Sequence, residues 1–187
     1  MNDFPLHTKE TAPANSKALI VEATKAYGFL PNLLATMAES PAILQGYMTL
    51  SDIFDRSNLT PTERQIVLMT NNRLNGCTYC MAAHTSISQA ANVSAEVITA
   101  LRDGSPLNDP KLEALRRFAV MINEDRGWID QDDLDELYDV GYTQATVFEV
   151  IVGTALKVMS NYTNHIVKTP LDEAFQANAW ESPTASA

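Results

Sequence analysis

The sequence predicts an all-α protein, and three observations lead to that prediction. Apolar residues recur at the three- and four-residue spacing of a helix along almost the whole chain. Glycine and proline are scarce, 7 and 9 of 187 residues, and fall between these periodic segments. No segment shows the strict alternation with hairpin turns that is typical of a sheet. The pattern predicts a bundle of about eight to ten helices.

The chain is expected to comprise an arm, one helical domain and a tail. Residues 1–14 contain Pro5 and Pro13 and should form an extended N-terminal arm. Residues 15–178 should fold as a single domain, since 45% of the chain is hydrophobic and 19% charged, as in ordinary globular proteins. The Ser- and Ala-rich residues 179–187 are expected to be frayed.

Capping residues and helix breakers mark the elements of the first half. Asn15 can cap the first segment, and Gly28 ends it. Proline near the first position opens the next two segments. Thr60 and Glu63 form a capping box before the apolar run of the fourth, which ends at the breaker Gly76. These signals predict helices over 15–27, 32–39, 41–55, 61–74 and 77–91.

Similar signals mark the second half. Ser94 caps a short helix, and Asp109 precedes a proline at the start of a longer one. An acidic surface helix follows and is closed by Gly141, and Thr143 begins the longest helix. The predicted helices cover 95–102, 110–122, 130–137, 143–165 and 171–178.

The longest predicted helix carries an apolar stripe and a polar stripe. The apolar stripe is expected to face the core and consists of Phe148, Ile151, Val152, Ala155, Leu156 and Met159. The polar stripe is interpreted as a solvated face, with a pocket or a subunit interface as the alternative. It consists of Thr146, Glu149, Gly153, Ser160 and Asn164.

Charge and hydropathy argue against several classes of partner. The formal charge of −10 disfavours nucleic acid, which requires a basic face. No apolar run reaches the roughly 18 residues of a membrane span, and the N-terminus lacks the basic and apolar regions of a secretory signal. A cytoplasmic location, with reduced thiols at rest, is the expectation.

The segment NGCTYCMAAH holds both cysteines of the chain. On a helix, Cys77, Cys80 and His84 fall within a sector of roughly 60° that faces inward, with Tyr79 on the exposed side. The first turn of a helix favours a thiolate, and His84 one turn beyond Cys80 can take or relay its proton. A second thiol can resolve a sulfenic acid into a disulfide. The segment therefore contains the parts of a peroxide-reducing cycle.

Two other interpretations of these residues stay open. Free cysteines are common core residues, so the pair could be purely structural. Cys77, Cys80 and His84 could also supply three zinc ligands, with His7 or His165 as a fourth. We favour neither and predict no metal and no cofactor. A thioredoxin-like fold is disfavoured because the strands of a βαβ pattern are absent.

The segment LTPTERQIVLMTNNRLNGCTYCMAAH resembles the core motif of the alkylhydroperoxidase D-like family, within the carboxymuconolactone decarboxylase superfamily. That motif is a helix opening with an "ERE"-like run, followed by Cys-x-x-Cys-x-x-x-His on the next helix. Residues 28–47 and the run Asn161-Tyr162-Thr163-Asn164-His165 also resemble this family. The resemblance covers roughly residues 28–175, and the cysteine–histidine core is its most specific part.

The resemblance implies an all-α bundle that assembles into trimers or hexamers and reduces hydroperoxides with its thiols. It implies that Cys80 attacks the peroxide, that Cys77 resolves the oxidised sulfur, and that His84 belongs to a proton relay. It also implies reduction by a lipoyl-bearing partner or another external dithiol. The hypothesis is therefore a thiol-dependent alkyl hydroperoxide reductase with an antioxidant role.

One departure concerns the relay carboxylate of the family, whose position is occupied here by Gln65. An amide can hold a water but cannot take a proton. Glu63 is the nearest carboxylate in sequence, but its place in a capping box already explains it. Glu149 in the long helix is another candidate.

Two other functions are kept as alternatives. One is a decarboxylase-like enzyme acting on a small lactone or keto acid, which would not need two cysteines. The other is a non-enzymatic redox-sensing or metal-binding oligomer that uses the same residues.

Overall fold

The computed structural model describes residues 4–183, and within them it is entirely helical, which confirms the predicted fold class. Nine α-helices and two short 3₁₀ helices make up these residues. The segment expected as a helix over 171–178 is the 3₁₀ helix η2 instead, and the first α-helix begins two residues after Asn15. The elements are η1 (Ala14–Ser16), α1 (Lys17–Tyr27), α2 (Asn32–Met37), α3 (Pro41–Asp55), α4 (Pro61–Leu74), α5 (Thr78–Ala90), α6 (Ala95–Asp103), α7 (Pro110–Glu124), α8 (Gln131–Asp139), α9 (Gln144–Val167) and η2 (Glu173–Asn178).

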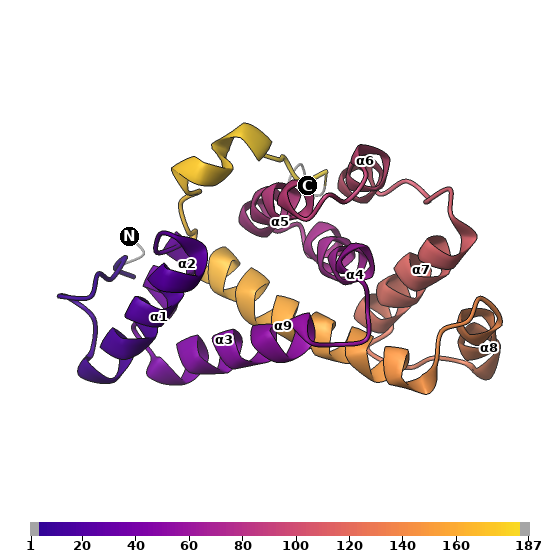
Figure 1. Ribbon diagram of the computed structural model, residues 1–187, viewed down its shortest axis with the longest axis horizontal. Coiled ribbons are helices and arrows are strands. Elements are labelled where there is room, and N and C mark those ends of the chain that lie inside the picture. Colours follow the sequence, from indigo (N-terminus) through magenta and orange to yellow (C-terminus); the bar gives the residue numbers. More distant parts are fainter. Residues whose placement is uncertain (1–3, 184–187) are drawn as a thin grey trace.

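Helix α4 occupies the centre of the fold, in contact with α5, α6, α7 and α9 (Figure 1). A helix that is enclosed by neighbours needs no polar face toward water. Nine of the ten positions from 63 to 72 are accordingly buried: Glu63, Gln65, Ile66, Val67, Leu68, Met69, Thr70, Asn71 and Asn72. The predicted capping box at its start is confirmed, since Thr60 Oγ1 accepts from the Glu63 N–H at 3.2 Å and Glu63 Oε2 accepts from the Thr60 N–H at 2.8 Å.

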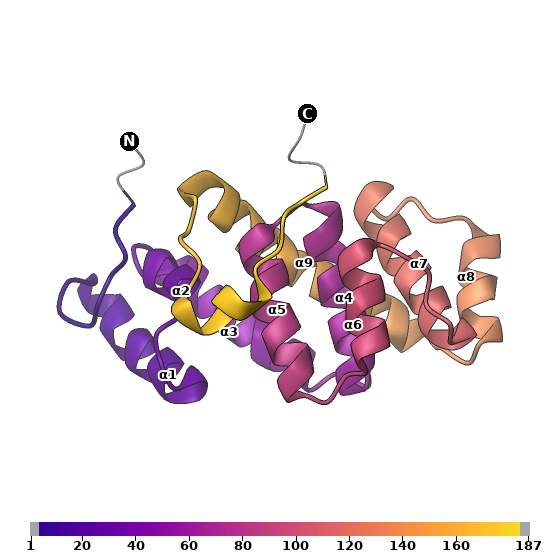
Figure 2. The same ribbon diagram turned by 90° about the horizontal axis from the view of Figure 1, so that it is seen from above.

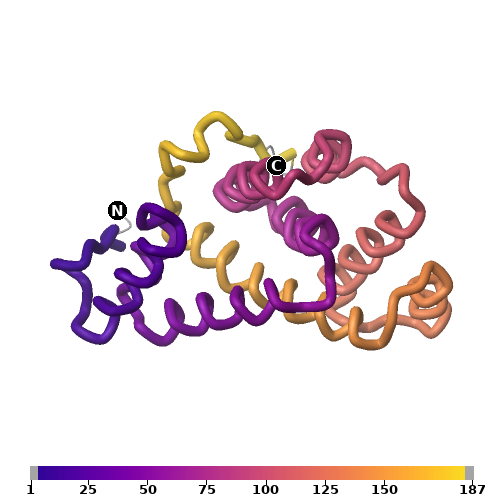
Figure 3. Tube along the Cα trace, in the orientation of Figure 1, coloured from indigo at the N-terminus to yellow at the C-terminus, as the bar shows by residue number. Residues whose placement is uncertain are grey.

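Helix α9 is the longest element and lies beside α3 along one side of the molecule (Figures 1 and 3). Its two stripes are placed only in part as predicted: Leu156 is buried and Val152 and Met159 pack against the core, as expected. Phe148 and Ile151, expected in the core, are 67% and 46% exposed. Most of the polar stripe, expected in solvent, is buried: Thr146, Gly153, Ser160 and Asn164. The helix therefore turns its polar side toward α4 and α5.

The C-terminal segment returns across α5 toward α6 (Figure 2). Arg102 of α6 holds it by donating to the carbonyl oxygens of Asn178 at 3.1 Å and Ala179 at 3.0 Å. The tail predicted to be frayed over 179–187 is described only to residue 183. Within that part, the Trp180 indole donates to the Arg102 carbonyl at 3.3 Å, so these residues pack on the domain.

The described part of the N-terminal arm is attached to helix α2. This part begins at residue 4, and the His7 N–H donates to Ala35 O at 3.2 Å. Among the helices of residues 4–183, none has the length and apolarity required to cross a bilayer.

We expect Gly153→Ala to lower the free energy of unfolding by about 1–3 kcal/mol, because side chains of α3 and α4 pack directly against α9 there. An added Cβ would lie 2.7 Å from Val67 Cγ1 and 2.9 Å from two Phe54 ring carbons. The matched change is Gly46→Ala in α3, where the new Cβ would meet only Met159 Cε at 3.5 Å. That variant should be as stable as the parent, or up to about 1 kcal/mol more stable. Urea unfolding of both variants measures the difference, and equal effects would contradict the close approach.

Candidate active site

The turn between α4 and α5 places both cysteines at the start of a buried helix. Gly76 makes this turn with a φ of +66°, which glycine adopts without strain. Cys77 is the N-cap of α5, and its N–H donates to Asn72 O at 2.9 Å. Cys80 lies one turn further, and both cysteines are free thiols, buried as the spacing predicted. The unpaired N–H groups of this first turn favour negative charge on the sulfur atoms.

Asparagine side chains from α4 and α9 surround the thiols. Asn164 Nδ2 donates to Cys80 Sγ at 3.2 Å and lies 3.8 Å from Cys77 Sγ. Asn72 Nδ2 donates to the Cys80 carbonyl at 3.2 Å, and Asn161 Nδ2 donates to Asn72 Oδ1 at 3.1 Å. These bonds connect α4 and α9 with α5, the helix that carries the cysteines, and they hold the sulfur atoms against α9.

The pKa values of the two thiols are shifted in opposite directions. Burial raises the pKa of Cys80, but the hydrogen bond from Cys77, the charge of Lys157 and bonds from Ser160 and Asn161 outweigh it and lower the pKa to about 5. The hydrogen bond to Cys80, together with burial, raises the pKa of Cys77. The proton of the pair therefore stays on Cys77 and the negative charge on Cys80.

His84 bridges Gln65 and Lys157. Lys157 Nζ lies 2.9 Å from His84 Nε2, and Gln65 Oε1 lies 2.9 Å from His84 Nδ1. An ammonium can only donate, so Nε2 accepts from Lys157 and Nδ1–H donates to the Gln65 amide oxygen. Burial, followed by the charge of Lys157, lowers the pKa of His84, so the ring is neutral near pH 7.

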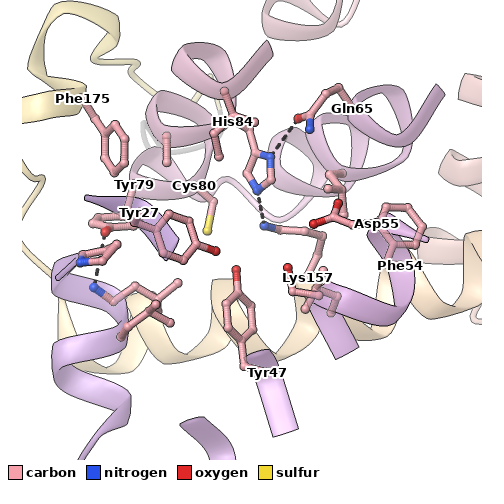
Figure 4. A pocket seen from close by; sticks show the side chains of 18 residues that line it. Tyr27, Tyr47, Phe54, Asp55, Gln65, Tyr79, Cys80, His84, Lys157 and Phe175 are labelled. Atoms are coloured by element: carbon pink, nitrogen blue, oxygen red, sulfur yellow. Dashed lines mark hydrogen bonds between the residues drawn. The ribbon is translucent and has the colours of Figure 1, made fainter. Parts of the chain in front are cut away.

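These groups meet at a cavity of about 200 Å³ (Figure 4). Its wall is mostly aromatic and aliphatic, with the sulfur of Cys80 and the polar ends of His84 and Lys157 exposed to it. A cavity of about 150 Å³ already holds benzene, so this one has room for a substituted ring or a branched alkyl group. The lining residues are Tyr27, Pro31, Leu33, Leu34, Tyr47, Ser51, Phe54, Asp55, Gln65, Leu68, Tyr79, Cys80, Ala83, His84, Ile87, Leu156, Lys157 and Phe175.

The C-terminal segment closes one side of this cavity. Phe175 of η2 lies edge-on to the ring of Tyr79, with ring centroids 6.2 Å apart. Tyr79 was expected on the exposed side of its helix but is buried. Its hydroxyl donates to Asp172 Oδ2 at 2.5 Å and accepts from the Leu33 N–H at 3.3 Å. Tyr79 therefore joins the motif helix to α2 and to the returning chain.

Neither carboxylate considered from the sequence lines the cavity. Glu63 accepts from the Tyr142 hydroxyl at 2.9 Å in addition to its capping bonds. Glu149 accepts from the backbone and side-chain N–H groups of Asn58, both at 2.8 Å, and so ties α9 to the loop before α4. Asp55 does line the cavity, and burial raises its pKa. Gln65, by contrast, sits directly against His84.

The other two histidines lie away from the motif. His7 Nε2 pairs with Glu39 Oε2 at 2.6 Å, and His165 is exposed on α9. Among residues 4–183, no group of three or more histidine, cysteine, aspartate or glutamate side chains is arranged to hold a metal ion.

Sequence reasoning missed Lys157, which is fully buried on α9. The signal was available, because Lys157 occupies the same helix face as Gly153, Ser160 and Asn164 at intervals of three and four residues. The whole face would have been read as the wall of a pocket had that lysine been counted with it.

The buried thiol pair, the neutral histidine and the enclosed cavity define a helical protein built to keep a reactive cysteine near an apolar ligand space. Residues 41–120 match the model of the carboxymuconolactone decarboxylase family. No curated protein matches the chain in sequence. This match over residues 41–120, together with the shared fold, supports the resemblance to the alkylhydroperoxidase D-like family of the carboxymuconolactone decarboxylase superfamily.

Solved structures share the fold over nearly the whole chain. A peroxidase-related protein from Ralstonia eutropha JMP134, described as an alkylhydroperoxidase AhpD core, has a TM-score of 0.82 and 21% identity over 92% of this chain and 93% of its own. A peroxidase-related protein from Silicibacter sp. TM1040 has a TM-score of 0.79 and 17% identity over 94% and 93%. The debrominase Bmp8, in which a cysteine-to-alanine variant was solved with 2,3,4-tribromopyrrole, has a TM-score of 0.76 and 19% identity over 94% of both chains.

We expect iodoacetamide to alkylate Cys80 of the reduced protein with a pH midpoint of about 5. The thiolate is the reactive form, and an ordinary cysteine would titrate near pH ~8.5. Because the pKa of Cys80 is lower in the folded protein, its contribution to stability is full above pH ~8.5 and is lost as the pH falls toward 5. Peptide mapping of the adduct from about pH 4 to about pH 10 measures the midpoint. Cys80→Ser serves as the blank. A midpoint near that of an ordinary thiol would contradict the stabilised thiolate.

Proposed function

We propose that this protein is a thiol-dependent hydroperoxide reductase. The observation that carries the proposal is the placement of the Cys80 sulfur at an apolar cavity, with a protonated Cys77 hydrogen-bonded to it. A thiolate nucleophile facing a ligand space, backed by a second thiol, suits the reduction of an O–O bond.

The cycle has three steps. The Cys80 thiolate attacks the terminal oxygen of the hydroperoxide, so that an S–O bond forms, the O–O bond breaks and the alkoxide takes up a proton to leave as an alcohol. Cys77 then attacks the sulfenic sulfur, an S–S bond forms, and the hydroxyl group leaves as water with the Cys77 proton. An external dithiol, free or carried as a lipoyl group on a partner protein, reduces the disulfide by thiol exchange.

The comparisons support this proposal at the level of the family. Two of the similar structures are described as peroxidase-related. In the proposed cycle His84 acts through Lys157, because its Nε2 atom accepts a hydrogen bond from that lysine. We further infer a cytoplasmic, antioxidant role, because a reducing compartment keeps both thiols free between turnovers.

Removal of halogen from a small aromatic ring is a second candidate. It is favoured by the similarity to the debrominase Bmp8 and by the aromatic lining of the cavity, which includes Tyr27, Tyr47 and Phe54. In that reaction the two thiols would supply two electrons, a C–Br bond would become a C–H bond, and bromide would leave. Bromide release from a brominated pyrrole, without consumption of cumene hydroperoxide, would favour this candidate.

The decarboxylase-like and non-enzymatic alternatives make different demands on the thiols. Turnover of a lactone or keto acid that survives Cys77→Ser combined with Cys80→Ser would favour the first. Stoichiometric zinc or copper in the purified protein would favour the second.

We also propose that the protein forms a homotrimer or homohexamer through α9. Its exposed apolar residues recur every three or four residues and form one continuous stripe of Phe148, Ile151, Ala155, Val158 and Tyr162. An exposed apolar stripe of this kind, on a helix whose opposite face lines the cavity, is typical of a subunit interface.

One equivalent of cumene hydroperoxide should abolish two free thiols per chain and lower the mass by only two hydrogens. In Cys77→Ser the resolving thiol is missing, so Cys80 should instead accumulate as a sulfenic acid that a dimedone probe labels. Thiol titration and intact mass spectrometry measure both results, with Cys80→Ser as the inert control. Thiols that survive the treatment unchanged would sink the proposed function.

Ile151→Asp combined with Val158→Asp should shift the protein from oligomer to monomer, because each change places a charge in the apolar stripe. Sedimentation velocity measures the shift. Val21→Asp, at a comparably exposed apolar position on α1, should leave the mass of the assembly unchanged. A monomeric parent, or an assembly that tolerates both charges on α9, would refute this interface.

A further inference from the structure

The interior of the molecule contains one cation that needs an explanation. Lys157 is fully buried, and its Nζ atom has a single hydrogen-bond partner, the neutral His84. Within residues 4–183, no carboxylate lies within ion-pair distance of it. A buried ammonium without a counterion strongly destabilises the folded state. The Cys80 thiolate, on which the charge of Lys157 acts, is the compensating anion.

Apart from the carboxyl group of Asp55, whose pKa burial raises, the polar groups beside Lys157 cannot deliver a proton readily. Gln65 is an amide and has no acidic proton to give. The Nε2 atom of His84 already accepts from Lys157, while its Nδ1–H points to Gln65 and away from the ammonium. The Nζ atom of Lys157, in contrast, lies beside the cavity near the Cys80 sulfur (Figure 4). It carries two further N–H groups that can donate.

We propose that Lys157 is the catalytic acid of this site: it holds the Cys80 thiolate and protonates the alkoxide released from the peroxide. This inference rests on the proposed function. Lys157 takes the place of a histidine–carboxylate relay, and His84 and Gln65 become positioning residues that aim its ammonium into the cavity.

The proton and electron pairs balance. When Cys80 attacks, the electrons of the O–O bond pass to the outgoing oxygen, which takes one proton from Lys157 and leaves as the alcohol. Lys157 is then a neutral amine beside a neutral sulfenic acid, so the cavity carries no net charge before or after the step. The amine next takes the Cys77 proton, and the new thiolate attacks the Cys80 sulfur. The departing hydroxide recovers that proton from Lys157 and leaves as water.

The experiment compares peroxides whose leaving groups differ in their need for a proton. Cumene hydroperoxide releases a strongly basic alkoxide, whereas peracetic acid releases acetate, which is stable without protonation. In Lys157→Met, any loss of thiolate slows both reactions equally, but only the first needs the acid. General acids contribute about 100-fold or more, so the ratio of the peracetic acid rate to the cumene hydroperoxide rate should rise by about that factor. Single-turnover disulfide formation at pH ~7 supplies both rates.

Chemical rescue provides a second variant. Lys157→Ala leaves space at the cavity that a small cation can enter. Ethylammonium should restore the cumene hydroperoxide reaction, whereas tetramethylammonium, with the same charge but no N–H, should not. Lys111→Met, the same type of change at a half-exposed lysine near Glu63, should leave both rates unchanged.

The outcomes separate the inference from the function on which it rests. If the parent protein reacts with neither peroxide, the proposed function fails, and the acid role fails with it. If the parent reacts but Lys157→Met slows both peroxides by the same factor, only the acid role is overturned. A raised ratio in Asp55→Asn instead would assign the proton to that carboxylate and would also overturn the inference.

Discussion

An ammonium and a thiolate share one apolar interior, and much of the fold serves to make that arrangement tolerable. Neither Lys157 nor the Cys80 thiolate would be stable there alone, because a buried charge must be paired and hydrogen-bonded. Asn164 donates to the sulfur, and His84 accepts from the ammonium. The close approach at Gly153, one turn before Lys157, lets α9 present the lysine to the motif helix. A larger residue at that point would move both charges apart.

The same constraint explains why α9 inverts the usual pattern of a surface helix. Its polar side carries Lys157, Ser160 and Asn164 and faces the thiols. Apolar residues such as Phe148, Ile151 and Val158 are therefore left on the outside. An exposed apolar stripe favours the association of subunits, because association removes the stripe from water. Burial of the functional face and the proposed assembly through the opposite face would thus both follow from one amphipathic helix.

Much of the fold could be predicted from the sequence because its signals are local. The capping box of Thr60 and Glu63, the break at Gly76 and the helical spacing of the motif each depend on residues within one or two turns. Which side of α9 faces the core could not be predicted in the same way, because a stripe of apolar residues fits either a core or a subunit interface. The helical spacing indicated that the thiols and His84 share one inward face, but the contact with Lys157 comes from more than seventy positions further along the chain.

Gln65 and Lys157 are best understood as a matched pair. A carboxylate at position 65 would accept from His84 Nδ1 and favour the imidazolium form, which would have to donate from Nε2 as well. That nitrogen is the atom on which the ammonium of Lys157 depends, and two cations 2.9 Å apart would repel each other. The neutral amide fixes the same tautomer without charging the ring, so the lone pair of Nε2 remains available to the lysine. The loss of the relay carboxylate is therefore the condition under which a lysine can occupy this site.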